Sequence, residues 1–308
     1  MKKLLIKIGF DDAEAQFFSN LYTRLDGQDK KLLDELGTEF SSGKCRETFA
    51  SFQEDLKPLA IKYNLDSRCV DMLFFLCNLE KMRQNYIKKG IDEQIFYDTA
   101  KDFKYKLDEC KKMLGLLGTR TFGWYYHFFN AEMVALGRFQ FHTFKFFDNL
   151  SYKWNDITIN PGDTVVNIHI PSSGSMPREM RMNSYKKAFE HYGKNKGDYL
   201  ALVCQSWLLY PKYKELFAEG SNMYDFIDDF DIISEVKERD GEFQNSWSVF
   251  ACAYNKDTSK VPADTTLQKN FIKHLNAGKS TGWGTGVILF DGEKIVNNKR
   301  ESFDNIKP

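Results

Sequence analysis

The sequence lacks the features that mark several specialised classes of protein. Its 43 Lys and Arg side chains are matched by 43 Asp and Glu side chains, and the two signs also balance within residues 1–118. A nucleic-acid-binding surface needs clustered positive charge, so no nucleic-acid partner is expected. No apolar run approaches the roughly 20 residues that cross a bilayer, and the apolar stretch at the N-terminus is too short for a secretory signal. We therefore expect no membrane partner.

Paired cysteines and metal-ligand spacings are also lacking. The six cysteines form no CxxC or zinc-ligand pattern, and they are scattered along the chain at Cys45, Cys69, Cys77, Cys110, Cys204 and Cys252. Such cysteines are typical of reduced thiols in a cytoplasmic protein. The five histidines show no metal-ligand spacing with one another or with the cysteines; they are His127, His142, His169, His191 and His274. No metal is therefore expected.

Proline is scarce in the first part of the chain, where Pro58 stands alone in residues 1–118. Apolar side chains there recur at helical spacing, for example from Phe49 to Tyr63 and from Phe96 to Leu117. Asp66 or Ser67 begins a helix that is apolar on nearly every side, which predicts a central position. Residues 1–119 are therefore predicted to form a helical domain.

The pattern changes near Gly118. Residues 137–144 alternate polar and apolar side chains, which predicts a strand with Arg138, Gln140 and His142 on one face. The other expected strands are 164–170, 199–204, 232–239, 247–253 and 286–290. The turn Asp240-Gly241 joins 232–239 to 247–253, and helices join the other consecutive strands of this list. Residues 120–308 are thus predicted to form a mixed β-sheet flanked by helices, and the chain as a whole is α+β.

Residues 164–207 organise the second domain. They are predicted to form a strand with Asn167 and His169 on one face, a turn, a helix starting near Ser175 or Met176, and a parallel strand. A Gly/Ser turn before a helix offers unpaired N–H groups to phosphate or another anion. The same turn is also an ordinary way to leave a sheet. A second candidate, Gly278-Lys279-Ser280-Thr281, is rejected as a phosphate-binding P-loop, because Lys273 stands where the loop requires Gly.

The order of these elements resembles the GNAT superfamily of N-acyltransferases. Several motifs resemble, more specifically, a bacterial group of predicted acyltransferases in which a helical domain precedes a GNAT-like domain. These motifs are Leu136-Gly137-Arg138-Phe139-Gln140-Phe141, Ile168-His169-Ile170-Pro171, Cys204-Gln205-Ser206-Trp207-Leu208-Leu209, Ser221-Asn222-Met223 and Asp264-Thr265-Thr266-Leu267-Gln268. The resemblance covers nearly the whole chain. The group often carries His where this chain has Gln205.

The resemblance implies an acyl-CoA co-substrate, such as acetyl-CoA, and acyl transfer to an amine. The CoA pyrophosphate would bind the turn, with the pantetheine between the strands that hold His169 and Cys204. The cofactor-binding residues that this implies are Ser172, Ser173, Gly174, Ser175, Met176, Arg178 and Arg181. The two arginines could equally be exposed to solvent alone.

For catalysis, His169 is the candidate base because imidazole titrates near neutrality; the alternative is a structural histidine. Tyr224 is the candidate acid, with Tyr210 and Tyr213 as competitors. Cys204 could form an acyl-enzyme or could simply pack in the core. Arg138, Gln140, His142 and Asn167 would line the acceptor side. The alternative function is a non-catalytic module that keeps the fold and binds CoA or a protein partner.

Overall fold

The computed structural model describes residues 1–43 and 48–297, so Cys45 lies outside the described residues. The chain forms two compact units. Unit 1 comprises Met1–Ala135 and Pro171–Ser173, and unit 2 comprises Leu136–Ile170 and the chain from Gly174 onward. The helical unit thus extends beyond the boundary predicted at residue 119. In the described part of the chain, no helix is both long enough and apolar enough to span a membrane.

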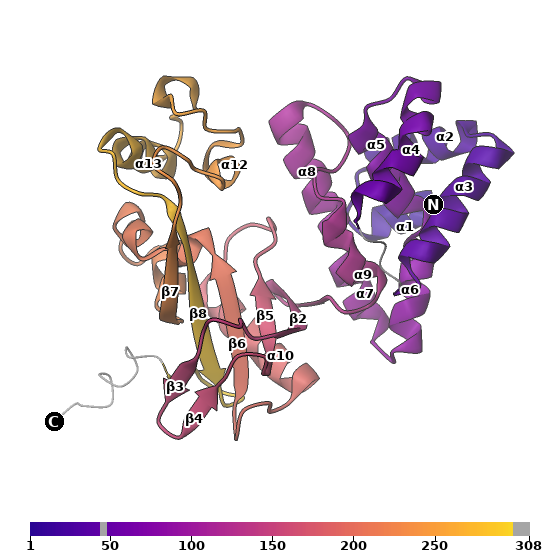
Figure 1. Cartoon of the computed structure of the whole chain (residues 1–308). Coiled ribbons are helices and arrows are strands. Elements are labelled where there is room, and N and C mark those ends of the chain that lie inside the picture. Colours follow the sequence, from indigo (N-terminus) through magenta and orange to yellow (C-terminus); the bar gives the residue numbers. More distant parts are fainter. Residues whose placement is uncertain (44–47, 298–308) are drawn as a thin grey trace. The chain divides into compact units, whose positions relative to one another are not determined.

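Unit 1 is built from helices, as its low proline content predicts. They are α1 (Lys2–Lys7), α2 (Asp12–Arg24), α3 (Gly27–Phe40), α4 (Ala50–Tyr63), α5 (Ser67–Cys77), α6 (Leu79–Lys88), α7 (Glu93–Ala100), α8 (Asp102–Leu114), the 3₁₀ helix η1 (Gly123–Tyr125) and α9 (Tyr126–Phe129) (Figure 1). Helix α5 is central, as predicted, since its residues from Cys69 to Leu76 are all buried. Asp66 caps it by accepting a hydrogen bond from the Arg68 N–H at 2.9 Å.

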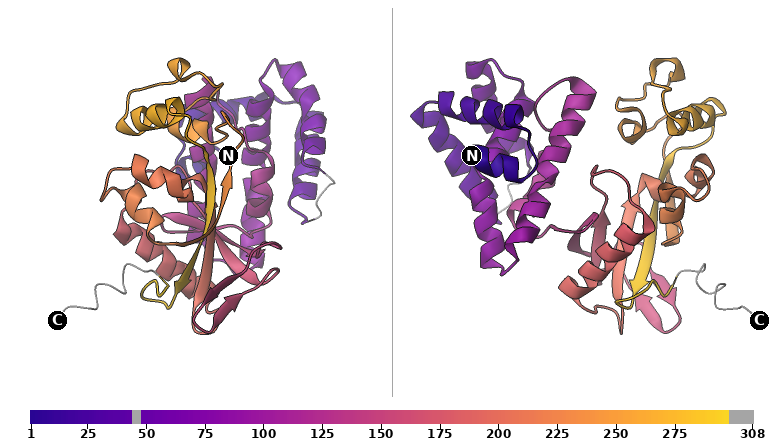
Figure 2. Two further views of the ribbon diagram at one scale, coloured as in Figure 1. Left: turned by 60° about the vertical axis from the view of Figure 1, so that its left-hand side comes forward. Right: turned by 180° about the vertical axis from the view of Figure 1, so that it is seen from behind.

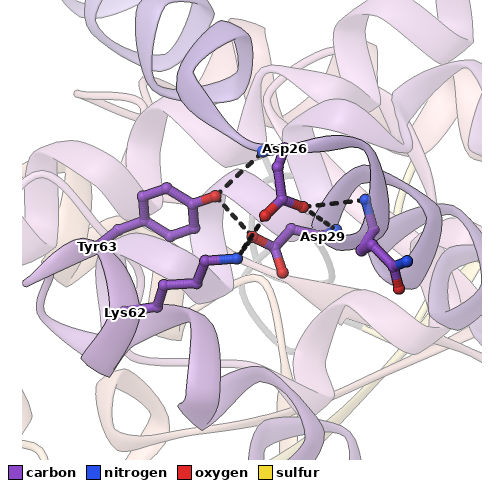
Figure 3. A network of polar contacts seen from close by, with 5 residues as sticks. Asp26, Asp29, Lys62 and Tyr63 are labelled. Atoms are coloured by element: carbon purple, nitrogen blue, oxygen red, sulfur yellow. Dashed lines mark hydrogen bonds and ion pairs between the residues drawn. The ribbon is translucent and has the colours of Figure 1, made fainter.

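A polar network ties α3 to the end of α4 (Figure 3). Asp26 caps α3 by accepting from the N–H groups of Gln28 and Asp29, both at 2.9 Å. Lys62 Nζ lies 2.6 Å from Asp26 Oδ2 and 2.8 Å from Asp29 Oδ2. The Tyr63 hydroxyl donates to Asp29 Oδ2 at 2.6 Å. These contacts raise the pKa of Lys62 and lower that of Asp26, so the network is charged across the physiological range.

Asp71 is a buried carboxylate in α5 and makes the stability of unit 1 depend on pH. Burial raises its pKa from 3.8 to about 6, although Gln53 Nε2 donates to its Oδ2 at 2.7 Å. Between these two values the folded state binds more protons than the unfolded chain, so stability falls as pH rises through that window. Asp71→Asn should therefore raise the free energy of unfolding by about 3 kcal/mol at pH 7.5 and by almost nothing near pH 4.

Urea unfolding of both proteins across this pH range would test the prediction. Glu35→Gln is a matched control, because the Glu35 side chain is 62% exposed and forms an ion pair with Lys31 of its own helix. It should leave stability almost unchanged at both pH values. An Asp71→Asn protein that is no more stable at pH 7.5 than the wild type would contradict the assignment.

Unit 2 is a sheet with helices around it. Its elements are β1 (Val134–Leu136, whose first two residues belong to unit 1), β2 (Phe139–Lys145), β3 (Tyr152–Trp154), β4 (Ile157–Ile159), β5 (Thr164–His169), α10 (Arg178–Tyr192), β6 (Leu200–Ser206), η2 (Trp207–Leu209), η3 (Pro211–Leu216), α11 (Asn222–Ile227), β7 (Asp231–Lys237), α12 (Ser246–Phe250), η4 (Thr258–Lys260), α13 (Thr266–Asn276) and β8 (Gly282–Phe290). The predicted mixed sheet with flanking helices is thereby confirmed.

The main sheet has the strand order β1-β2-β5-β6-β8-β7. Strand β5 pairs in parallel with β6, and α10 lies between them in the chain, so the predicted crossover is correct. The pairs β2–β5, β6–β8 and β7–β8 are antiparallel. A separate hairpin of β3 and β4 was not predicted.

The two faces of the sheet are covered differently (Figure 2). Helix α10 covers one face, where Tyr185 packs on Phe139 and Phe290 with ring centroids 5.7 and 6.1 Å apart. The β3–β4 hairpin packs on the other face, in a cluster that includes Tyr152, Ile159, Val165, Val203 and Leu289. The hairpin cluster occupies only one end of that face.

One predicted strand is wrong. Residues 247–253 were expected to pair in the sheet, but Ser246–Phe250 form the short helix α12. The helix buries Val249 and Phe250, and the Phe250 ring packs edge-on against Phe243 at 6.2 Å. Ala251 ends the helix with a left-handed φ of 55°. Tertiary packing therefore overrides the strand preference of this apolar run.

Candidate functional site

The site is centred where β5 and β6 part. Their registered pairs are Val166 with Leu202 and Asn167 with Val203. Strand β5 continues to His169 and β6 to Ser206, and these last residues form no further registered β5–β6 pair within the described chain. The carboxyl ends of both strands therefore frame an opening in the hydrogen-bonded ladder.

Polar side chains line the hairpin face of the sheet next to this opening. Strand alternation and register place them on one face, and we call them the polar strip: Gln140, His142, Asn167, His169, Gln205 and Thr285. Gln140, His142 and Asn167, three of the four residues predicted to line the acceptor side, thus share a face with the candidate base His169. Gln205 Nε2 donates to Thr285 Oγ1 at 3.4 Å, extending the strip across β6 and β8.

The centre of the strip is a pair of histidines. His169 Nε2 lies 2.9 Å from His142 Nδ1, and the two rings stack with centroids 4.9 Å apart and planes 12° apart. Asn167 Nδ2 lies 3.1 Å from the same His169 nitrogen. Both histidines are half-buried. A proton can therefore be shared between the two rings at a position that solvent still reaches.

The turn after β5 is exposed from Ser172 to Ser175 and leads to the N-terminus of α10. Gly174 has a φ of +101°, which strongly favours glycine. The helix begins at Arg178 with Pro177 as its N-cap, not at Ser175 or Met176 as predicted. Pro177 provides no side-chain cap, and the N-terminus of a helix is a position that favours a bound anion.

The other residues of the turn differ in what they offer. The Ser173 N–H donates to the Pro171 carbonyl at 2.8 Å, so it is already used inside the turn. The Ser172 hydroxyl donates to the Glu109 carboxylate of unit 1. Met176 is buried, with 5% of its surface exposed. The backbone N–H groups of Ser175 and Met176 are thus the better anion donors of the predicted set.

The three candidate arginines have different environments. Arg178 is half exposed at the start of α10, and its Nη1 lies 3.9 Å from Asp229 Oδ1. Arg181 is fully buried and binds Asp229, with Nε–Oδ2 at 2.6 Å and Nη2–Oδ1 at 3.2 Å. Arg138 is 6% exposed and donates to carbonyls of the turn. Arg181 and Arg138 therefore contact the protein itself where direct ligand contacts were expected.

Cys204 lies on the other face of the sheet. Its register partner is Gly286, and its side chain alternates with those of Val203 and Gln205. It is 1% exposed, and burial raises the pKa of its thiol to about 12. At neutral pH it is therefore a protonated thiol on the face opposite His169, which favours the packing interpretation.

Tyr224 lines a cavity of about 600 Å³, together with Pro211, Lys212, Lys214, Glu215, Lys279 and Ser280. The Lys214 ammonium lies 4.6 Å from the centre of its ring. The competing tyrosines are buried: the Tyr210 hydroxyl bonds Ser280 Oγ at 2.8 Å, and the Tyr213 hydroxyl accepts from the Gly282 N–H at 3.2 Å. Of the three, Tyr224 is the one that opens to a cavity.

Several residues of the site were not identified from the sequence. Thr285 and Gln205 enter the polar strip only through the β6–β8 register, although alternation along β6 could have placed Gln205. Asp229, the partner of Arg181, is 48 residues away in the chain, and Glu109, the partner of Ser172, is 63 residues away. Such distant pairings leave no local pattern. Across residues 1–43 and 48–297, no group of three His, Cys, Asp or Glu side chains could hold a metal ion.

Several solved structures share this fold. A mutant acyltransferase in complex with octanoyl-CoA matches with a TM-score of 0.70 and 16% identity, covering 94% of this chain and 87% of that chain. An acyltransferase in complex with decanoyl-CoA matches with a TM-score of 0.69 and 20% identity, covering 94% of this chain and 86% of that chain. An acyltransferase in complex with decanoyl-CoA and teicoplanin matches with a TM-score of 0.68 and 16% identity, covering 94% of this chain and 87% of that chain. A comparison with curated protein sequences gave no match.

Family models match both parts of the chain. The model of the N-acyltransferase N-terminal domain matches residues 1–131, and that of the GNAT-like C-terminal domain matches residues 133–288. Together they cover nearly the whole described chain in the order that the sequence motifs predict. The protein therefore belongs to the two-domain GNAT-like acyltransferases.

Proposed function

We propose that this protein binds an acyl-CoA and transfers its acyl group to an amine. The observation that supports the proposal is that an exposed turn before α10, the end of the registered β5–β6 pairing and a histidine pair follow one another along β5. The similar acyltransferases were solved with octanoyl-CoA or decanoyl-CoA. These complexes make a medium-length acyl-CoA a suitable first substrate to test, alongside acetyl-CoA.

The turn and α10 would bind the CoA pyrophosphate. The N–H groups of Ser175 and Met176 and the first turn of α10 supply hydrogen bonds, and the positive end of the helix dipole adds charge. Arg178, which is half exposed and lies 3.9 Å from Asp229, would extend this set with its guanidinium. The pantetheine arm would then run into the opening beyond the last β5–β6 pair, where the two strand edges can hydrogen-bond its amides.

His169 would act as the general base. The amine nitrogen attacks the thioester carbonyl carbon while Nε2 of His169 takes a proton from the amine, and His142 can share that proton across 2.9 Å. The C–S bond then breaks, and the CoA thiolate takes up a proton from an acid. Tyr224 stays our hypothesis for that acid. Asn167 flanks the histidines on the polar strip and would orient the acceptor, whereas Gln140 on the same strip is buried.

Binding and turnover assays test the proposal and separate it from the alternative of a non-catalytic module. Acetyl-CoA, octanoyl-CoA and CoA should each raise the melting temperature, because a ligand that binds only the folded state stabilises it by RT ln(1 + [L]/Kd). Thiol release from the acyl-CoA in the presence of a panel of amines should follow. Stabilisation without thiol release for any amine would favour the module, and no stabilisation by any CoA would refute the proposal.

A direct transfer predicts that Cys204→Ala retains most of the activity. The thiol is protonated and lies on the opposite face of the sheet from His169, so it cannot supply the nucleophile. Intact mass of the wild type incubated with acyl-CoA should show no added acyl group. An adduct that disappears in Cys204→Ala would establish an acyl-enzyme in place of direct transfer. The described cysteines are all free thiols, which agrees with our proposal of a cytoplasmic location.

A further inference from the structure

Two buried arginines donate hydrogen bonds to the backbone carbonyl groups of the turn that precedes α10. Arg138 Nη2 donates to the Gly174 carbonyl at 2.8 Å, and Arg138 Nε donates to the Ser175 carbonyl at 3.0 Å. Arg181 Nη1 donates to the Met176 carbonyl at 2.9 Å. Three consecutive carbonyl oxygens thus face guanidinium groups.

This arrangement fixes the direction of the N–H groups in the turn. A trans peptide unit is planar, and its C=O and the following N–H point in opposite directions. When the carbonyls of Gly174 and Ser175 face Arg138, the N–H groups of Ser175 and Met176 must face away from it. These are the two donors that the turn would present to a phosphate.

Both arginines are anchored to rigid parts of unit 2. Asp229 binds Arg181 through two oxygens and also accepts from the Tyr185 hydroxyl at 3.0 Å. The Arg138 backbone N–H donates to Ser184 Oγ, on α10, at 2.6 Å. Gly137 permits this approach, because a Cβ there would lie 2.7 Å from the same Ser184 oxygen. The Arg181 guanidinium is therefore held by Asp229, and the Arg138 backbone is held on α10.

We propose that Arg138 and Arg181 are positioning residues for the acyl-CoA pyrophosphate, acting through the carbonyls of Gly174, Ser175 and Met176. The inference rests on the proposed function and adds how the turn is kept ready for its anion. In this proposal Arg138 does not contact the acceptor and Arg181 does not contact phosphate, although direct contacts were expected for both. Preorganised donors of this kind bind without having to be ordered by the ligand.

The test compares ligands with and without the pyrophosphate. For Arg138→Met we expect the Kd of CoA, measured by calorimetry, to rise by roughly 10- to 100-fold, the effect of losing one to two hydrogen bonds to a charged group. The kcat/KM for an acyl-pantetheine, which lacks the pyrophosphate, should change less than about twofold from its wild-type value, because the histidine pair is untouched. Arg239→Met is the matched control: it removes one exposed positive charge from the same unit and should leave both quantities unchanged.

Arg138→Lys separates positioning from a direct charge contact with phosphate. Lysine keeps the positive charge but has a single nitrogen, so it cannot hold two carbonyls in the geometry of Nε and Nη2. We expect it to weaken CoA binding about as much as Arg138→Met. Wild-type CoA affinity in Arg138→Lys would overturn the inference, as would equal losses for CoA and acyl-pantetheine in both variants. If the wild type itself binds no CoA, the proposed function fails, and the inference fails with it.

Discussion

Replacing His169 with Gln is expected to lower kcat/KM by roughly 10²–10⁴-fold, the usual cost of losing a general base. Glutamine keeps a hydrogen-bonding group near His142 and Asn167 but cannot take up a proton. The wild-type kcat/KM should rise with pH through the range in which imidazoles titrate, and this rise should be missing in the variant. The measurements are pH–rate profiles of both proteins with one acyl-CoA and one amine.

The same variant distinguishes catalysis from a purely structural role. As a base, His169 can be replaced with little change in CoA affinity or melting temperature. As a structural residue, its loss would cost about 1–3 kcal/mol of stability and leave the shape of the pH profile intact. His127→Gln serves as the control, since His127 is a half-exposed histidine of unit 1 whose Nδ1 pairs with Glu132 at 2.7 Å. That variant should keep the wild-type rate and profile.

Gly174→Pro is expected to abolish CoA binding while the protein remains folded. Proline fixes φ near −65°, whereas Gly174 has a φ of +101°, so the turn must change its path. The Arg138 contact with the Gly174 carbonyl would then be lost, and the N–H groups of Ser175 and Met176 would turn from their present directions. The site is exposed, so unfolding of the whole unit is not expected. Calorimetric titration with CoA and a melting curve of the same sample measure both effects.

A milder pair of variants controls for backbone strain. Gly174→Ala and Gly220→Ala both place a Cβ at a positive φ, +101° and +74°, with no atom within 4 Å to obstruct it. Each should cost roughly 1–2 kcal/mol of stability, the price of a left-handed conformation for an L-residue. Only Gly174→Ala should weaken CoA binding. Equal CoA affinity in the two variants would show that the turn is not part of the CoA-binding site.

Patterns that repeat along the chain predicted the fold well. The helical spacing from Phe49 to Tyr63 corresponds to α4, and the polar turn between two apolar strands corresponds to the parallel β5–β6 unit. Alternation predicted that Gln140 and His142 share one face of β2 and that Asn167 and His169 share one face of β5, and the register of the two strands brings these faces together. Burial periodicity is a property of neighbouring residues, so it can be read without knowing what they pack against.

The errors arose where a distant side chain decides the local structure. The start of α10 was placed two or three residues early, because nothing near Gly174 indicates that Arg138, 36 residues earlier, binds its carbonyl. Arg181 was expected to be exposed, because its pairing with Asp229 depends on how α10 docks. The hydrogen bond between His142 and His169 follows from strand register, which alternation alone does not fix.

The position of β8 within the sheet bears on how unit 2 is synthesised. It is the last strand in the described chain, yet it lies between β6 and β7, and β7 pairs with no other strand of the sheet. On the ribosome, β7 must therefore wait without a partner until residues 282–290 have emerged, about 45 residues after its own last residue. A nascent chain stopped before Gly282 would leave the edges of both β6 and β7 exposed, and exposed strand edges recruit other chains. Truncated forms of this protein should consequently aggregate and be degraded, although all of unit 1, including residues 171–173, has already been synthesised by then.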